Sequence, residues 1–186
     1  MPVIVELGCG PRKRPGRIGV DQVKLPCVDI VADINKGLPF FSDNSVDEIH
    51  TNSLVAHLDD LSAFLQELTR VLKKDGKVFL FTPHFSNPYF YSDYTHKRFF
   101  GLYNFYYFVD QDKQLKRKVP TFYGNTRIEI ESIKLVFTSP FRILNYGKKI
   151  FQAIINSHSA IQEFYEENLS RIIPCYGMEI IFRPDK

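Results

Sequence analysis

The opening of the chain constrains its fold more than any other stretch. Residues 3–5 are apolar and β-branched, which is typical of a strand that is buried on both faces. Gly8 and Gly10 follow, so the backbone can turn sharply there and another molecule can approach it closely. A second short apolar run, residues 18–20, ends in Asp21, whose carboxylate could hold a pair of ribose hydroxyls. This pattern predicts the ligand-binding end of an open α/β sheet.

The connection that follows Gly10 indicates which kind of ligand fits there. A dinucleotide site needs G-x-G-x-x-G at the start of a helix, because the pyrophosphate lies on the amides of that helix. Here the third glycine position is Lys13, and Pro11 and Pro15 remove amide donors. Too few residues remain for a packed helix. A phosphate-free nucleoside such as S-adenosylmethionine needs only the glycine approach and an acidic ribose partner; the alternative is a glycine-rich turn without a ligand.

Composition narrows the class of protein further. A length of 186 residues indicates a single domain, residues 1–186, and the net charge of +3 is too small to argue for nucleic acid. The three cysteines are odd in number and far apart, which favours reduced thiols and a cytoplasmic protein. No apolar run approaches the length of a membrane span, and the first strand leaves no room for a signal peptide.

The first half of the chain alternates strand-like and helical patterns. We expect strands at residues 28–34, 46–51 and 77–82, and a helix over 61–72 that Asp59 or Asp60 caps and Gly76 ends. This order predicts a parallel sheet with ligands at the carboxyl ends of its strands. The first crossover is shorter than parallel neighbours usually need. Either an unusually tight loop joins the first two strands, or the second strand is a fragment.

The second half is less regular. Apolar and polar residues alternate over residues 126–137, as in a strand with one buried face. Most of the apolar residues stand at even positions before Ser132 and at odd positions after it, which predicts a β-bulge there. We expect a short helix at residues 150–155, a second helix opened by a capping box, Ser159-x-x-Gln162, and a last strand at residues 178–182. These elements would extend the sheet of the first half.

Two segments of this half bear on the substrate. Residues 84–108 are crowded with aromatic side chains, which would form a water-excluding lid or stack on a planar acceptor. Residues 113–118 carry four basic side chains, either as a solvated loop or as a contact for an anionic substrate or RNA.

Several motifs of the first half occur together in the order of a known family. The chain resembles class I S-adenosylmethionine-dependent methyltransferases, in their small type-11-like group, over residues 3–82. Beyond that the resemblance thins, although residues 94–100 resemble a segment of members with a shortened glycine loop. The motifs are Glu6-Leu7-Gly8-Cys9-Gly10, Asp21, Ala32-Asp33-Ile34, Leu38-Pro39-Phe40, residues 43–49, and Leu65-x-x-Leu68-x-x-Val71-Leu72-Lys73-x-x-Gly76.

The resemblance implies a Rossmann-like α/β fold with a seven-stranded, mostly parallel sheet and an antiparallel last strand. The first crossover helix would be shortened or missing. It also implies S-adenosyl-L-methionine as the cofactor, a cofactor half at residues 3–82, and an acceptor or lid half at residues 83–186.

The matching positions imply the cofactor-binding residues. The ribose would contact Asp21, the adenine amino group Asp33, and the adenine ring Ile34. The remaining positions, beneath the methionine and ribose or beside the sulfonium, are Glu6, Gly8, Cys9, Gly10, Asn52, Ser53 and Leu54. Without the first helix, the methionine carboxylate needs another partner. Arg12 or Arg14 could supply a charge-assisted hydrogen bond, or both could simply be solvated.

Methyl transfer from a sulfonium is an in-line displacement, in which positioning supplies much of the acceleration. A protonated oxygen or nitrogen acceptor also calls for a base near neutral pH. His84 follows the fifth expected strand, with Asp93 and His96 downstream, and these three are our catalytic candidates. Alternatively, they hydrogen-bond to the loop backbone. We expect no metal, because the spacing of these three matches no tight metal motif. His57 either lines the cofactor cleft or is structural.

We therefore expect a cytoplasmic methyltransferase acting on an unidentified acceptor, a small molecule or a glycan precursor. We expect no membrane partner, nucleic acid is not favoured, and the oligomeric state is open. One alternative is a non-catalytic S-adenosylmethionine-binding protein. Another, against which the glycine loop argues, is a nicotinamide-dependent oxidoreductase.

Overall fold

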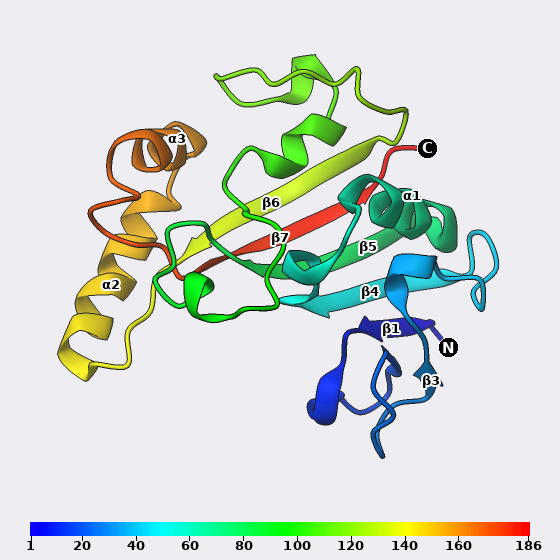
Figure 1. Cartoon of the computed structure of the whole chain (residues 1–186). Coiled ribbons are helices and arrows are strands. Elements are labelled where there is room, and N and C mark those ends of the chain that lie inside the picture. The colour runs from blue at the N-terminus through cyan, green and yellow to red at the C-terminus, as the bar shows by residue number, and fades with distance from the viewer.

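The computed structural model describes the whole chain, residues 1–186. Seven strands form one sheet in the order β3-β2-β1-β4-β5-β7-β6 (Figure 1). All pairs from β3 to β5 are parallel, whereas β7 is antiparallel to both β5 and β6. The expected fold class is confirmed. The strands are β1 Ile4–Leu7, β2 Ile18–Asp21, β3 Ile30–Val31, β4 Val46–Asn52, β5 Leu72–Pro83, β6 Ile128–Val136 and β7 Gly177–Pro184.

The first crossover is a tight loop. β1 and β2 are parallel neighbours, with Val5 opposite Ile18. The chain between them forms only a single 3-10 turn, Gly10–Arg12, with Pro11 within it. The expectation of a missing crossover helix is therefore confirmed, and the second strand is a true member of the sheet.

The crossover from β4 to β5 contains the helix α1, Leu61–Val71. Asp60 is its N-cap, since its Oδ1 accepts hydrogen bonds from the amides of Ser62 at 2.8 Å and Ala63 at 3.1 Å. The expected stop at Gly76 is wrong. The helix ends at Val71, because Leu72 already pairs with Val46 as the first residue of β5.

The strand expected at residues 28–34 is shorter than predicted. Only Ile30–Val31 pair with β2, and Val31 is half exposed. The chain then leaves the sheet because Asp33 caps a 3-10 turn, Ile34–Lys36. This early departure places Asp33 and Ile34 in a loop beyond the carboxyl end of the strand.

The second half contains two helices, α2 Arg142–Ile155 and α3 Ser159–Asn168, which lie beside each other at one end of β6 and β7 (Figure 1). The predicted bulge is confirmed, as the β6–β7 register shifts between Ile130 and Ser132. The predicted capping box is wrong. His158 caps α3 by accepting from the Ala160 amide, and the Gln162 side chain instead donates to the Ile133 carbonyl of β6 at 2.8 Å.

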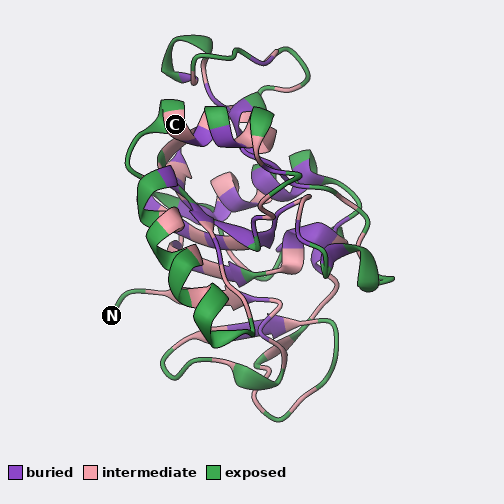
Figure 2. Ribbon diagram, turned by 90° about the vertical axis from the view of Figure 1, so that its left-hand side faces the viewer, coloured by how far each residue is buried: buried purple, intermediate pink, exposed green.

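The core is one continuous cluster of 35 buried residues that runs along the sheet and the inward side of α1. Figure 2 shows these buried segments inside and the exposed turns outside. None of the helices has both the length and the apolar character that crossing a lipid bilayer requires.

Candidate functional site

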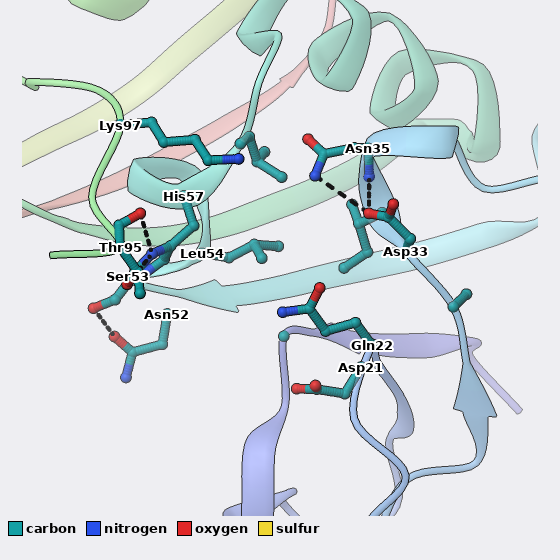
Figure 3. Close-up of a pocket in the computed structure, with 14 residues that line it drawn as sticks. Asp21, Gln22, Asp33, Asn35, Asn52, Ser53, Leu54, His57, Thr95 and Lys97 are labelled. Carbon is teal, nitrogen blue, oxygen red and sulfur yellow. Dashed lines mark hydrogen bonds between the residues drawn. The ribbon is translucent and has the colours of Figure 1, made fainter.

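A cavity of about 460 Å³ opens beyond the carboxyl ends of β1, β2 and β4 (Figure 3). β1 lies between β2 and β4, so this is the point at which the strand order reverses, where open α/β sheets bind their ligands. The volume is within the range of about 300–1,000 Å³ that is usual for small-molecule sites. The lining residues are Gly8, Asp21, Gln22, Ala32, Asp33, Ile34, Asn35, Asn52, Ser53, Leu54, His57, Leu58, Thr95 and Lys97.

Asp21 is the last residue of β2, and backbone amides fix its carboxylate. Oδ2 accepts from the Gly10 amide at 2.9 Å, and Oδ1 accepts from the Val23 amide at 3.0 Å. A carboxylate oxygen carries two lone pairs, so each oxygen keeps one acceptor site. The arrangement can receive the two hydroxyl protons of a ribose.

Gly8 gives the cavity a wall of bare backbone. Its φ is +66°, a conformation that L side chains rarely adopt. A Cβ at this position would lie 3.2 Å from Cδ1 of Leu54, tighter than ordinary van der Waals contact. A larger residue would be strained there and would crowd the Leu54 side chain, which lines the same cavity. The absence of a side chain therefore keeps this space open to a ligand.

Asp33 and Ile34 offer a polar and an apolar contact side by side. Oδ1 of Asp33 accepts from the backbone and side-chain nitrogens of Asn35, at 3.1 and 3.2 Å. Its Oδ2 lies 4.0 Å from the exposed Lys36 ammonium, so this oxygen can accept from an amino group. Ile34 is 8% exposed and forms an apolar surface. This pairing suits the amino group and ring of an adenine. The two carboxylate acceptors, Asp21 and Asp33, together with the bare backbone of Gly8, therefore fit an adenosine cofactor.

Three other residues that the family resemblance implies for cofactor binding do not line this cavity. Cys9 is buried, and this burial, followed by the nearby Asp21 carboxylate, raises the pKa of its thiol. Gly10 acts through its amide, which holds Asp21. The Glu6 carboxylate accepts from the Arg14 amide at 3.1 Å and lies 3.3 Å from the Arg17 guanidinium, away from the cavity.

Glu6 lines a second cavity, of about 810 Å³, on the sheet face that a first crossover helix would cover. The two cavities share Asn52 and Ser53, at the end of β4. Arg12 and Arg14 border the second cavity, and neither guanidinium has an acidic partner. The shared residues thus join an adenosine-sized space to a space with two free positive charges.

The structure separates the three catalytic candidates. His84 is fully buried: its Nε2 donates to Glu166 of α3 at 2.9 Å, and its Nδ1 accepts from the Ser86 amide at 3.2 Å. Glu166 also accepts from the Leu102 amide at 2.8 Å. His84 therefore connects the end of β5 to α3 and to the aromatic segment, and it lines neither cavity.

Asp93 and His96 lie together, with His96 Nε2 3.6 Å from Asp93 Oδ2. His57, which lines the first cavity, is their neighbour: its ring centroid lies 4.8 Å from that of His96. Hydrogen bonds from the hydroxyl and amide of Thr95, in that order of effect, lower the pKa of the Asp93 carboxyl. The structure thus brings two of the three candidates to the edge of the cavity.

Sequence reasoning missed several lining residues. Thr95 and Lys97 lie in the segment 94–100, which was singled out by resemblance but was given no role at the site. The backbone amides of Lys97 and Arg98 donate to the Ala56 carbonyl at 2.8 and 3.2 Å, so this segment is held beside the end of β4. Gln22 directly follows Asp21, and Asn35 lies two residues after Asp33, so closeness in the sequence to a recognised aspartate was the available signal.

Residues 15–80 match a family model described as a methyltransferase domain. No curated protein sequence matches the chain. Among solved structures, a SAM-dependent methyltransferase from Archaeoglobus fulgidus is similar with a TM-score of 0.62 and 18% identity, over 98% of this chain and 86% of that chain. A SAM-dependent methyltransferase from Thermotoga maritima has a TM-score of 0.57 and 16% identity, over 100% and 83%.

A third similar structure is a Haloferax volcanii protein in complex with the Trm112 methyltransferase activator, with a TM-score of 0.55 and 12% identity, over 97% of this chain and 81% of that chain. At these identities the structures establish the fold. Together with the family model they imply S-adenosylmethionine as the cofactor. The resemblance to class I S-adenosylmethionine-dependent methyltransferases of the type-11 group is thereby confirmed.

Proposed function

We propose that this protein transfers the methyl group of S-adenosylmethionine to a small-molecule acceptor, such as a glycan precursor. The observation that carries the proposal is the cavity at the strand reversal, with the Asp21 carboxylate fixed by two amides beside the bare backbone of Gly8. The cofactor supplies an activated methyl on a sulfonium, and the protein binds, orients and excludes water.

The nucleoside part binds through residues of the first cavity. Asp21 accepts from the ribose hydroxyls, Asp33 accepts from the adenine amine, and Ile34 packs against the ring. Asn52, Ser53 and Leu54 border the reacting centre, since they lie at the end of β4, where Asn52 and Ser53 line both cavities and Leu54 lines the first. Glu6 holds the loop at the second cavity through Arg14 and Arg17, and the buried Cys9 stands between the two glycines of the turn.

The methionine carboxylate binds to Arg12 or Arg14. Both guanidiniums border the second cavity without an acidic partner, whereas Arg17 is already paired with Glu6. A fold of this kind usually offers a helix N-terminus near the glycine turn, but here the chain forms only a three-residue turn. Charge-assisted hydrogen bonds take over the task of the missing amides.

Residues 83–186 form the acceptor and lid half of the single domain. His96 is the better candidate for a base, because Asp93 lies beside it and the pair is at the cavity edge. We assign to His84 a positioning role, since it is buried and tied to Glu166. The three free cysteines fit a reducing compartment, and we place the protein in the cytoplasm.

Calorimetry with S-adenosylhomocysteine tests the cofactor assignment. We expect one site per chain, and Asp21→Ala should weaken binding by about 1–3 kcal/mol, the scale of a lost hydrogen bond to a charged group. The control is Asp75→Ala, an exposed aspartate of β5 that lines neither cavity. An unchanged dissociation constant in Asp21→Ala would remove this residue from the site.

Turnover distinguishes the enzyme from a protein that only binds the cofactor. Wild-type protein with S-adenosylmethionine and a panel of hydroxyl and amine acceptors should form S-adenosylhomocysteine. Tight binding without product across the panel would favour the non-catalytic alternative. Affinity for NAD without affinity for S-adenosylmethionine would instead favour an oxidoreductase.

A further inference from the structure

A cluster of metal-ligating side chains lies where the aromatic segment meets the end of β4. His57 comes from the turn after β4, while Asp93 and His96 come from the turn after Phe90–Ser92. One ligand atom from each, two imidazole nitrogens and a carboxylate oxygen, lies within 4.8 Å of the others. The segments meet because the Lys97 amide donates to the Ala56 carbonyl at 2.8 Å.

Hydrogen bonds fix the tautomers of both imidazoles. His96 Nδ1 lies 2.9 Å from the Phe90 carbonyl, which can only accept, so Nδ1 carries the proton and Nε2 keeps its lone pair. His57 Nδ1 lies 3.2 Å from the Thr95 carbonyl and 3.0 Å from the Thr95 hydroxyl oxygen, whose proton is donated to Asp93, so this Nδ1 also carries the proton. A ring N–H bound to a backbone carbonyl is the usual second contact of a metal-bound histidine.

The two oxygens of the Asp93 carboxylate also differ: one is held by hydrogen bonds and the other is left for a ligand. Asp93 Oδ1 accepts from the Thr95 amide at 2.9 Å and from its hydroxyl at 2.5 Å. Oδ2 accepts no hydrogen bond from that turn and lies 3.6 Å from His96 Nε2. In a tetrahedral zinc site, metal–ligand distances of about 2.0–2.1 Å place ligand atoms about 3.4 Å apart. This pair is therefore close to the spacing that a metal requires.

The surroundings hold the ligands in place. The His96 side chain is 8% exposed, and its ring stacks on Phe90 at 4.4 Å between centroids. His57 and Thr95 also line the first cavity (Figure 3). His84 cannot join the cluster, because Glu166 already occupies its Nε2. Two histidines and one carboxylate leave the further coordination positions of a metal for water or a substrate oxygen.

We propose that His57, Asp93 and His96 bind a divalent first-row metal ion of the zinc type at the edge of the first cavity. The proposal does not depend on methyl transfer; with the ion bound, Nε2 of His96 is a ligand, so His96 no longer serves as the base. It replaces the expectation, made from spacing along the chain, that the protein uses no metal.

Tag-free, full-length protein treated with a chelator is titrated with ZnCl₂ by calorimetry, and with CoCl₂ while the visible spectrum is followed. We expect one ion per chain and intense visible bands of low-coordinate Co²⁺, without a thiolate charge-transfer band. Asp93→Asn keeps an acceptor for the Thr95 amide but loses the charged ligand. Asp93→Asn and His96→Ala should each weaken metal binding by more than about 100-fold, which exceeds the usual effect of losing a residue that only hydrogen-bonds to a metal ligand.

The matched control is His158→Asn, which removes an exposed histidine but keeps an N-cap acceptor for α3. It should bind the ion as the wild type does. Circular dichroism verifies that each variant is folded, and bound Zn²⁺ should raise the Tm of the wild type but not of Asp93→Asn. The proposal is overturned if the wild type binds no better than Asp93→Asn. A thiolate band that disappears in Cys27→Ser would overturn it as well.

Discussion

Two crossovers of the same sheet join parallel strands by different physical means. Between β4 and β5 the chain forms α1, which buries an apolar side made of Leu61, Phe64, Leu65, Leu68 and Val71. Between β1 and β2 the chain has no buried residue in its one turn. That loop is held by charged contacts instead, of which Lys13 with Asp29, at 2.6 Å, is one example.

The difference explains why the second cavity exists. A helix after β1 would cover the sheet face around Glu6 and His50, whereas the short loop leaves this face open and borders it with arginines. The β4–β5 crossover packs apolar side chains against the sheet, and the β1–β2 crossover leaves the second cavity open to a ligand. Changes in the β4–β5 crossover should therefore affect stability, and changes in the β1–β2 crossover should affect ligand binding.

The largest effect is expected in the packed crossover. Leu68→Ala removes a fully buried side chain, and we expect a loss of about 2–5 kcal/mol in the free energy of unfolding. Urea denaturation measures this loss. Gln66→Ala, on the exposed side of α1, is the control and should change the free energy by less than about 0.5 kcal/mol. Equal effects of the two variants would contradict the packing role of the helix.

The loop crossover is tested by comparing two ligands. The double variant Arg12→Ala/Arg14→Ala should bind S-adenosylhomocysteine about tenfold more weakly, because it loses charged hydrogen bonds to the carboxylate. Methylthioadenosine lacks the amino acid part, so its affinity should not change. Calorimetry with both ligands checks the difference. Equal weakening for both ligands would show that the arginines shape the loop rather than hold the carboxylate.

The N-cap of α1 is the next test of the packed crossover. Asp60→Ala removes the acceptor for two helix amides and should cost about 1 kcal/mol in the free energy of unfolding. Asp60→Asn keeps an acceptor and serves as the control. If urea denaturation shows the same loss for both variants, the capping hydrogen bonds are not the cause.

The smallest effect depends on pH. Glu67 of α1 is paired with Arg70 and accepts from the Leu38 amide, and these contacts lower the pKa of its carboxyl, Arg70 most of all. A carboxyl whose pKa is lower in the folded state stabilises the protein at pH values above its unfolded-state pKa. This contribution is lost as the pH falls through the folded-state pKa. Glu67→Gln should therefore be destabilised near pH 7, with a smaller difference from the wild type near about pH 3. Urea denaturation at both values measures it, and a difference that grows toward acid would contradict the sign.

Features that depend on local sequence could be predicted. The spacing of apolar residues identified α1, and the parity change identified the bulge at Ser132. The start of α2 at Arg142 was missed because its first turns expose their apolar residues; Ile143, for example, is 88% exposed. The apolar residues of these first turns still recur at helical spacing, Ile143 with Ile150 and Leu144 with Phe151, so the periodicity was an available signal.

The cofactor cavity was predictable because its residues follow consecutive strands of one sheet. The environment of the histidines was not, because it depends on segments far apart in the chain. His84 meets Glu166 through the packing of α3, and His57 meets His96 through backbone bonds to Ala56. Tertiary contacts of this kind leave no periodic signal.

The most direct test of the account is a crystal structure of the protein with S-adenosylhomocysteine. We expect this structure to show ribose hydroxyls on Asp21, the adenine beside Ile34, and the sulfur next to Asn52 and Ser53, where the two cavities meet. A ligand bound elsewhere, or a pyrophosphate group in that cavity, would contradict it.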